Sequence, residues 1–191
     1  MRYQPEHRAE VRRKIVKEAS QRIRADGLHG AGIAMVMADT GLTHGGFYKH
    51  FGSKDELLLE SLKDAFGEIG DTLVRAAEQS GAEPPWKAIV KAYLTRRFCD
   101  HPERGCPLPA LAPELARVDQ KMRKRILPEL ARYKDRMVPF MPGRRPADQE
   151  RAFFAIFSTM AGAIEIARML PEPAMQEKVL EAARDLLLRS F

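Results

Sequence analysis

The sequence predicts an all-α protein. Every long segment places apolar residues at helical spacing, no segment alternates convincingly with the two-residue period of a strand, and glycine and proline divide the chain into helix-sized pieces. A chain of 191 residues with 45% hydrophobic side chains can bury a core, either as one domain or as a small head on a larger body.

The first three predicted helices are separated by glycine. A helix at about 6–26 carries one apolar stripe and stops at the glycine that follows, and a short helix is expected at about 33–39. Gly41 ends this short helix, because glycine tolerates the positive φ that often follows a helix. A second short helix is expected over 43–50, with Thr43 placed to cap it. The apolar stripe of the first helix consists of Val11, Ile15, Ala19 and Ile23, and the inward-facing residues of the next are Ile33, Val36 and Met37.

The strongest amphipathic pattern begins at Ser53. Ser53 and Glu56 form a capping box, in which each side chain accepts a hydrogen bond from a free backbone N–H. This helix ends near Gly81, and its apolar stripe consists of Leu58, Leu62, Phe66, Ile69, Leu73 and Ala76. Further helices are expected at about 85–99, 107–117, 119–138, 147–170 and 173–189.

Positive charge is concentrated at the N-terminal end. Residues 1–54 contain ten Lys and Arg against five Asp and Glu, whereas residues 55–191 contain twenty-two against twenty-one. This asymmetry fits a nucleic-acid-binding head on a neutral body, although a solvated basic face explains the charge alone equally well.

The composition also predicts a cellular location. Two cysteines do not make a disulfide framework, so we expect a reducing cytoplasm. The N-terminus lacks the apolar run of a signal peptide, and no stretch approaches the roughly 20 apolar residues of a membrane span. We therefore expect a cytoplasmic protein without a membrane partner.

The two short helices and their glycine turn form a helix-turn-helix, whose second helix enters the major groove of DNA. Gly45 and Gly46 would let the backbone approach the duplex, and Tyr48 offers a hydroxyl to a phosphate. His44 and Lys49 can reach base edges. The sequence therefore predicts a DNA-binding segment here.

Neighbouring residues support this segment. Phe47 and Phe51 are assigned to a small core of the head. Lys54 lies at a helix N-terminus, where free N–H groups and the helix dipole already favour an anion, so its ammonium would complete a phosphate site.

The stretch GLTHGGFYKHFGSKDELL, residues 41–58, resembles the signature of the TetR family of bacterial transcriptional regulators. The wider match covers about 11–62 and includes the spacing Tyr-x-x-Phe-x-x-Lys. The resemblance implies a nine-helix fold, a homodimer on a palindromic operator, and a larger domain that binds a small effector. It implies a head over 1–53, with the helix-turn-helix at about 32–51, and an effector-binding and dimerisation domain over 54–191.

Family roles can be transferred only to matching positions. The resemblance implies that Tyr48, His50 and Lys54 contact phosphates and that Thr43, His44, Gly45 and Lys49 face the groove. The family often has Thr or Ser just before the second helix, whereas this chain has Ala31 and Gly32. The difference predicts a weaker start of that helix.

The body contains large apolar side chains that could line an effector pocket or form solid core. They are Trp86, Tyr93, Phe98, Met122, Met137, Phe153 and Phe157. If a pocket exists, its ligand is expected to be apolar or aromatic.

The segment 147–170 is apolar almost all round, so it needs two partners, its own core and a second subunit. Small residues there leave room for close helix approach, and the last helix presents a further apolar face. The predicted dimer interface consists of Phe154, Ala161, Gly162, Val179, Ala183, Leu186 and Leu187.

Cys106 precedes Pro107, which suits the first position of a helix, so the thiol would occupy the cap where the dipole favours a thiolate. With Arg104 beside it, Cys106 could sense oxidants or electrophiles, as in some members of the resembled family. The favoured interpretation is a small half-buried cap residue. Cys99, His101 and Cys106 lack a fourth ligand at usable spacing, so no metal site is predicted.

The leading functional hypothesis is a ligand-responsive dimeric repressor. An activator of the same family would share the same head. From a different class, the chain could be a helical scaffold or an enzyme whose basic head is incidental. No nucleophile–base pair, metal set or cofactor loop supports an enzyme, and no cofactor is expected.

Overall fold

The computed structural model describes residues 5–30 and 32–191, with the backbone alone at positions 5, 30 and 44. Over these residues it contains nine α-helices, three short 3-10 helices and no strand, which confirms the all-α prediction. The α-helices are α1 (Pro5–Gly30), α2 (Ile33–Asp39), α3 (Lys54–Glu78), α4 (Pro85–Tyr93), α5 (Arg96–Asp100), α6 (Pro107–Leu115), α7 (Gln120–Met137), α8 (Pro146–Met169) and α9 (Pro173–Ser190). The 3-10 helices are η1 (His44–Lys49), η2 (Pro102–Arg104) and η3 (Val138–Phe140).

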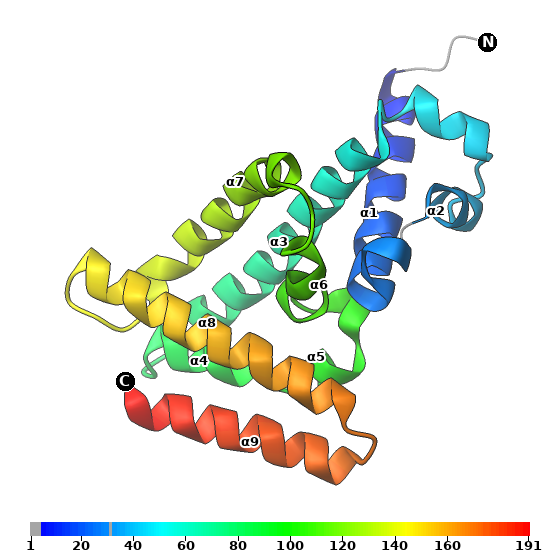
Figure 1. The fold of residues 1–191 in the computed structure, drawn as a ribbon. Helices are drawn as coiled ribbons and strands as arrows, with labels where there is room; N and C mark the ends of the chain where they lie inside the picture. Colours follow the sequence, from blue (N-terminus) through cyan, green and yellow to red (C-terminus); the bar gives the residue numbers. More distant parts are fainter. Residues whose placement is uncertain (1–4, 31) are drawn as a thin grey trace.

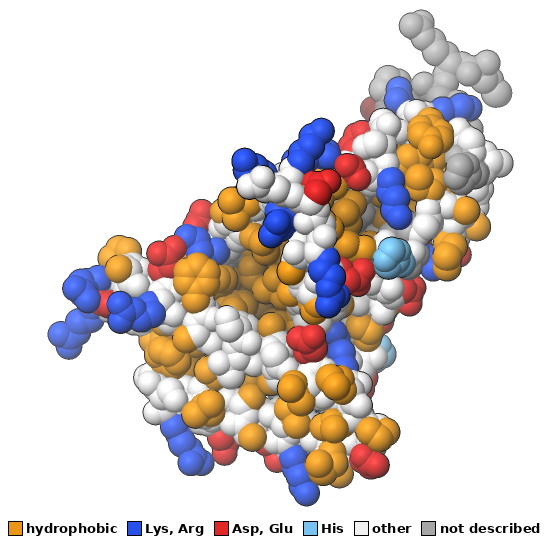
Figure 2. Space-filling view, viewed as in Figure 1, with side chains coloured by type: hydrophobic (Ala, Val, Ile, Leu, Met, Phe, Trp, Pro, Cys, Tyr) orange, Lys and Arg blue, Asp and Glu red, His pale blue; other side chains and the backbone are white. Residues whose placement is uncertain are grey.

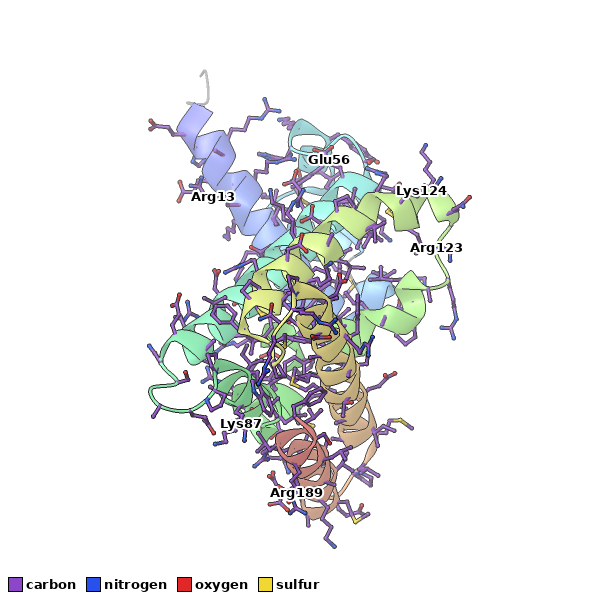
Figure 3. All side chains as sticks on the ribbon, turned by 90° about the vertical axis from the view of Figure 1, so that its left-hand side faces the viewer. Arg13, Glu56, Lys87, Arg123, Lys124 and Arg189 are labelled. Atoms are coloured by element: carbon purple, nitrogen blue, oxygen red, sulfur yellow. The ribbon has the colours of Figure 1, made fainter. Side chains whose placement is uncertain are left out.

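Figure 1 shows α1, α2 and the start of α3 at one end of the molecule and α8 with α9, side by side, at the other. The long helix α3 connects the two ends and packs against α1, α4 and α7. In Figure 3 side chains fill the space between the helices, while Arg13, Lys124 and Arg189 project outward.

Helix α1 turns sharply at Gly27. This residue has φ 75°, a left-handed value that glycine adopts without strain, and a short helical stretch continues to Gly30. A Cβ at Gly27 would lie 2.3 Å from Oε1 of Glu114 on α6. The amide of Leu28 donates to Oε2 of the same carboxylate at 3.0 Å. The end of α1 is therefore fixed against α6.

The helix-turn-helix is present, but its second helix is not an α-helix. Gly41, with φ 75°, separates α2 from η1 as predicted. The predicted side-chain cap is wrong: Thr43 occupies the N-cap position of η1 but makes no capping hydrogen bond. Gly45 and Gly46 lower helix propensity, which agrees with the short 3-10 form.

The small core of the head is confirmed. Phe47 and Phe51 are buried, and their rings stack with centroids 5.4 Å apart. Gly32 occupies the N-cap of α2 and provides no side-chain hydrogen bond, as the sequence suggested, while Ala31 lies outside the described residues.

Helix α3 opens with the predicted cap in a slightly different form. Oγ of Ser53 accepts from the Glu56 amide at 3.1 Å, but the Glu56 carboxylate accepts from the amide of Gly52, at 2.7 Å, rather than from that of Ser53. The predicted stripe is right at its centre and shifted at its ends, because Leu57 and Ala77 are fully buried whereas Leu58 and Ala76 are half-buried.

The predicted helix over 85–99 is two helices. It breaks at Leu94, with ψ 70°, and restarts at Thr95, whose Oγ1 accepts from the Phe98 amide at 3.3 Å. Helix α7 passes through Pro128 without ending.

Helix α8 has two apolar faces. One is buried against the body and includes Phe153, Ile156 and Met160, and the other is exposed. By length and composition α8 is apolar enough to cross a membrane, although the sequence analysis found no such span. A core helix meets the same criterion, and the buried face of α8 contributes to the core.

Candidate nucleic-acid interface and core aromatic cluster

The predicted DNA-binding residues gather at one end of the molecule. Thr43, Gly45 and Lys49 are exposed, and Tyr48 is 65% exposed. Lys54 is the first residue of α3 and is exposed, whereas Gly46 and His50 are half-buried. The backbone of His44 begins η1, and its side chain lies outside the described atoms.

Helix α1 contributes to the same surface. A hollow of about 650 Å³ separates it from η1, and its lining includes His7, Arg8, Thr43, Gly46, Tyr48, Lys49 and His50. Sequence reasoning omitted His7 and Arg8. The signal that could have found them is the basic first turns of the predicted N-terminal helix.

Two arginines of α1 hold η1 and α3 in place. Nη2 of Arg8 donates to the carbonyl of Lys49. The Arg12 guanidinium lies 4.2 Å above the Phe51 ring and forms ion pairs with Glu56, at 2.6 Å, and Glu60. The hydrogen bond from Arg12 holds the pKa of Glu56 below its usual range. The short helix η1 is thus positioned by α1 as well as by α3.

The pKa of His50 is lowered from its ordinary value. Burial is the main cause, and the positive charges of Arg8, Arg12 and Lys49 lower the pKa further.

Arg24 joins the head to the body. Its side chain is fully buried, and the guanidinium bonds the carbonyls of Ser20, at 3.1 Å, and Gly105, at 3.2 Å. It also forms an ion pair with Glu68 at 2.7 Å. Burial raises the pKa of Glu68, but hydrogen bonds from Lys17 and Arg24 outweigh it and lower the pKa overall.

Cys106 occupies the N-cap of α6, as predicted, but as a core residue that is 2% exposed. The expectation that Arg104 favours its thiolate is wrong. Arg104 is exposed and pairs with Glu103, and burial raises the pKa of Cys106. Burial also raises the pKa of Cys99. Among the described residues no three His, Cys, Asp or Glu side chains are grouped to hold a metal.

Four predicted pocket residues share one aromatic cluster. Tyr93 contacts Phe98 and Phe157, with ring centroids 5.3 and 6.3 Å apart, and Phe153 lies 4.5 Å from Phe157. Tyr133, which sequence reasoning omitted, joins the cluster at 5.6 Å from Phe157. Phe66 of α3 adds a further ring, 5.3 Å from that of Tyr133. Tyr133 lies on the buried side of α7 with Met122, Ile126 and Met137.

The other three predicted pocket residues are buried but do not join the ring contacts of this cluster. Trp86 packs against Phe191 at the C-terminus, with centroids 6.0 Å apart. Met122 and Met137 lie on the buried side of α7.

The predicted dimer residues are partly available to a second subunit. Phe154 is 55% and Leu186 60% exposed, and Ala161, Gly162, Val179 and Ala183 are half-buried. Leu187 is only 3% exposed, so its assignment to the interface is wrong: it lies in the core of its own chain. Ile166 and Met169 extend the exposed apolar face of α8 and were missed.

Known proteins resemble this chain in sequence and in fold. Residues 15–61 match the family model of bacterial regulatory proteins, tetR family. The uncharacterized HTH-type transcriptional regulator YxaF of Bacillus subtilis (strain 168) is 26% identical over 119 residues. That match covers 61% of this chain and 62% of YxaF, less than two thirds of either.

Two solved structures share the fold over nearly the whole chain. A TetR transcriptional regulator from Chloroflexus aurantiacus J-10-fl superposes with a TM-score of 0.75 at 23% identity, covering 95% of this chain and 94% of that one. A TetR-family regulator from Cytophaga hutchinsonii gives 0.74 at 21% identity, covering 95% of each chain. The helical arrangement of head and body is therefore that of these regulators.

Proposed function

Because this chain belongs to the TetR family and is a helix-turn-helix DNA-binding transcriptional regulator, we propose that it is a homodimeric repressor. It binds a palindromic operator and is released when a small effector binds the body. The head covers 1–53, with the helix-turn-helix at about 32–51, and 54–191 forms the effector-binding and dimerisation domain. It acts in the cytoplasm, without a cofactor or catalytic activity.

The observation that carries this proposal is the exposed polar side of η1. Tyr48 and Lys49 are exposed, as is Lys54 at the start of α3, while Phe47 of the same segment is buried. The segment is thus anchored by an apolar side chain and leaves its hydrogen-bonding groups for a nucleic acid. Its end of the chain also carries most of the excess positive charge.

Each residue of this surface has a proposed role. Tyr48, His50 and Lys54 bind phosphates. Lys49, with Thr43 and His44, faces the major groove. Gly45 and Gly46 allow close approach; a Cβ at Gly45 would meet nothing within 4 Å in the chain, so any clash there would be with the DNA.

The exposed faces of α8 and α9 support the homodimer. Large apolar side chains that water surrounds in the single chain would be buried between two copies. Two heads then reach two half-sites of a palindrome, and a single head offers too few contacts for tight binding.

The aromatic cluster supports the effector site. It lies in the body, and Gly105 of the adjacent loop receives a hydrogen bond from Arg24 of the head. A ligand that shifts the start of α6 would therefore disturb the position of α1.

Fluorescence anisotropy with the DNA upstream of the protein's own gene tests the proposal. We expect tight, saturable binding to an inverted repeat, and much weaker binding to a scrambled duplex of the same length and composition. Equal affinity for the two duplexes across a salt series would refute sequence-specific regulation.

A further inference from the structure

Two tyrosine hydroxyls in the centre of the body have no nitrogen or oxygen partner. Tyr93 of α4 and Tyr133 of α7 are both buried, and within the described part of the chain no nitrogen or oxygen atom hydrogen-bonds either hydroxyl. Buried polar groups in folded proteins are nearly always hydrogen-bonded, because an unsatisfied one lowers the stability of the fold. Two such groups on different helices of one cluster need an explanation.

The thiol of Cys106 satisfies them only weakly. It makes a side-chain hydrogen-bond interaction with each hydroxyl. A thiol is a weak donor and a weak acceptor, so each hydroxyl lacks a strong partner. Burial raises the pKa of both phenols well above their usual value, so the hydroxyls keep their protons and can donate them.

The surroundings suit a flat, apolar molecule. The rings of Phe66, Phe153 and Phe157 pack around the two tyrosines. Figure 2 shows the surface hollowed over the region between α6, α7 and α8, with hydrophobic side chains inside the hollow.

Two positive charges lie near the hydroxyls, that of Arg168 near Tyr93 and that of Arg136 near Tyr133. Arg168 of α8 interacts electrostatically with Tyr93 and Cys106, and its guanidinium donates to the carbonyls of Phe98 and Cys99, at 2.7 and 3.1 Å. It disfavours a bound cation and favours an oxygen with partial negative charge.

We propose that the hydroxyls of Tyr93 and Tyr133 bind an acceptor oxygen on an uncharged aromatic effector, such as an aryl ketone or a phenol. The effector enters through the hollow between α7 and α8, and its ring packs among the aromatic side chains. This inference rests on the proposed function, because it gives the chemical class of the effector.

Two probes of matched shape test the inference in the absence of DNA. β-Acetylnaphthalene carries a ketone oxygen, and β-isopropylnaphthalene replaces it with a methyl group. By isothermal titration calorimetry we expect the full-length protein to bind the ketone about tenfold more tightly than the hydrocarbon. Equal affinities, or no binding of either probe, would overturn the inference.

Hydroxyl-deleting variants locate the contact. Tyr93→Phe and Tyr133→Phe keep both rings, and we expect each to reduce the preference for the ketone severalfold and the double variant to abolish it. Thr72→Val removes a hydroxyl of α3 that bonds its own helix, and should leave the preference unchanged. A preference that survives in the double variant would also overturn the inference.

Stability measurements separate a binding role from a structural one. Because the thiol of Cys106 is a weak partner and neither hydroxyl has a nitrogen or oxygen partner, Tyr93→Phe and Tyr133→Phe should unfold at nearly the same denaturant concentration as the wild type or at a higher one. Marked destabilisation by both would show that the hydroxyls bond within the protein, and would contradict the inference. None of these readouts involves an operator, so a failure here is distinct from a failure of DNA binding.

Discussion

The guanidinium of Arg24 donates a hydrogen bond to the carbonyl of Gly105, 81 positions away in the sequence, at 3.2 Å. Gly105 directly precedes Cys106, where α6 begins, and Arg24 belongs to the first helix of the head. The same guanidinium pairs with Glu68 of α3. One buried side chain thus joins the head, the central helix and the start of α6.

Replacing this arginine should destabilise the fold. Arg24→Met leaves the Gly105 carbonyl and part of Glu68 unpaired, and we expect a loss of about 2–3 kcal/mol in the free energy of unfolding, measured in urea. Lys17→Met is the matched control, because Lys17 pairs with the same carboxylate at 2.9 Å from a half-buried position. The Lys17→Met variant should lose only about 0–1 kcal/mol in the free energy of unfolding. Similar losses in the two variants would contradict the role given to Arg24.

Replacement of Lys54 and replacement of Lys49 should weaken DNA binding in different ways. Lys54→Ala removes a phosphate contact, so we expect weaker binding to specific and random duplexes alike and a smaller salt dependence, by about one unit in the slope of log K against log salt. Lys49→Ala should instead cost about 1–3 kcal/mol on the operator and little on random DNA. Anisotropy titrations at several salt concentrations measure both quantities. Equal losses on both duplexes for Lys49→Ala would remove this residue from the base-reading set.

The exposed face of α8 should control assembly. Phe154→Glu would bury a charge between the subunits, so we expect monomers in sedimentation velocity and loss of tight operator binding. Gly162→Trp should act similarly, because a Cβ there meets nothing within 4 Å in its own chain and any clash would be with the partner. Lys124→Glu, on the exposed side of α7, is the charge-changing control. Persistent dimers in the α8 variants would place the interface elsewhere.

Cys106 should be unreactive in the folded protein. Burial raises the pKa of its thiol and excludes reagents, so at about pH 7 we expect iodoacetamide to label native Cys99→Ser protein at least tenfold more slowly than the same protein in urea. Mass spectrometry follows the adduct, and Cys106→Ser serves as the control. Fast native labelling that also releases the operator would restore a sensing role for this thiol.

The sequence was sufficient where a position depends on local chemistry. Gly41 ends α2 because glycine readily adopts the left-handed backbone conformation found there. The cap of α3 was predictable because Ser53 lies three residues before Glu56, which is the spacing of a capping box. The assignment of Phe47 and Phe51 to the small core of the head is likewise confirmed, since both are buried.

One error is local, and the others concern contacts between distant segments. Thr95 was predicted to lie inside the helix at 85–99, whereas it caps α5. A threonine can occupy a helix interior or an N-cap, so its identity alone does not decide between the two. Leu187 and Leu186 are adjacent, and only the packing of α9 on the chain decides which of them is buried. The environment of Cys106 depends on Tyr93 and Tyr133, which lie in helices far from it in the sequence.

The contact between Leu28 and Glu114 limits how this protein can be recombined. A hybrid that fuses residues 1–53 to the body of another regulator would separate the Leu28 amide from its acceptor on α6 and Arg24 from the Gly105 carbonyl. The foreign body would have to supply both acceptors at the same places, or the transplanted head would be held in a different orientation. An exchange of DNA specificity is therefore better made by replacing η1 alone than by moving the head as a module.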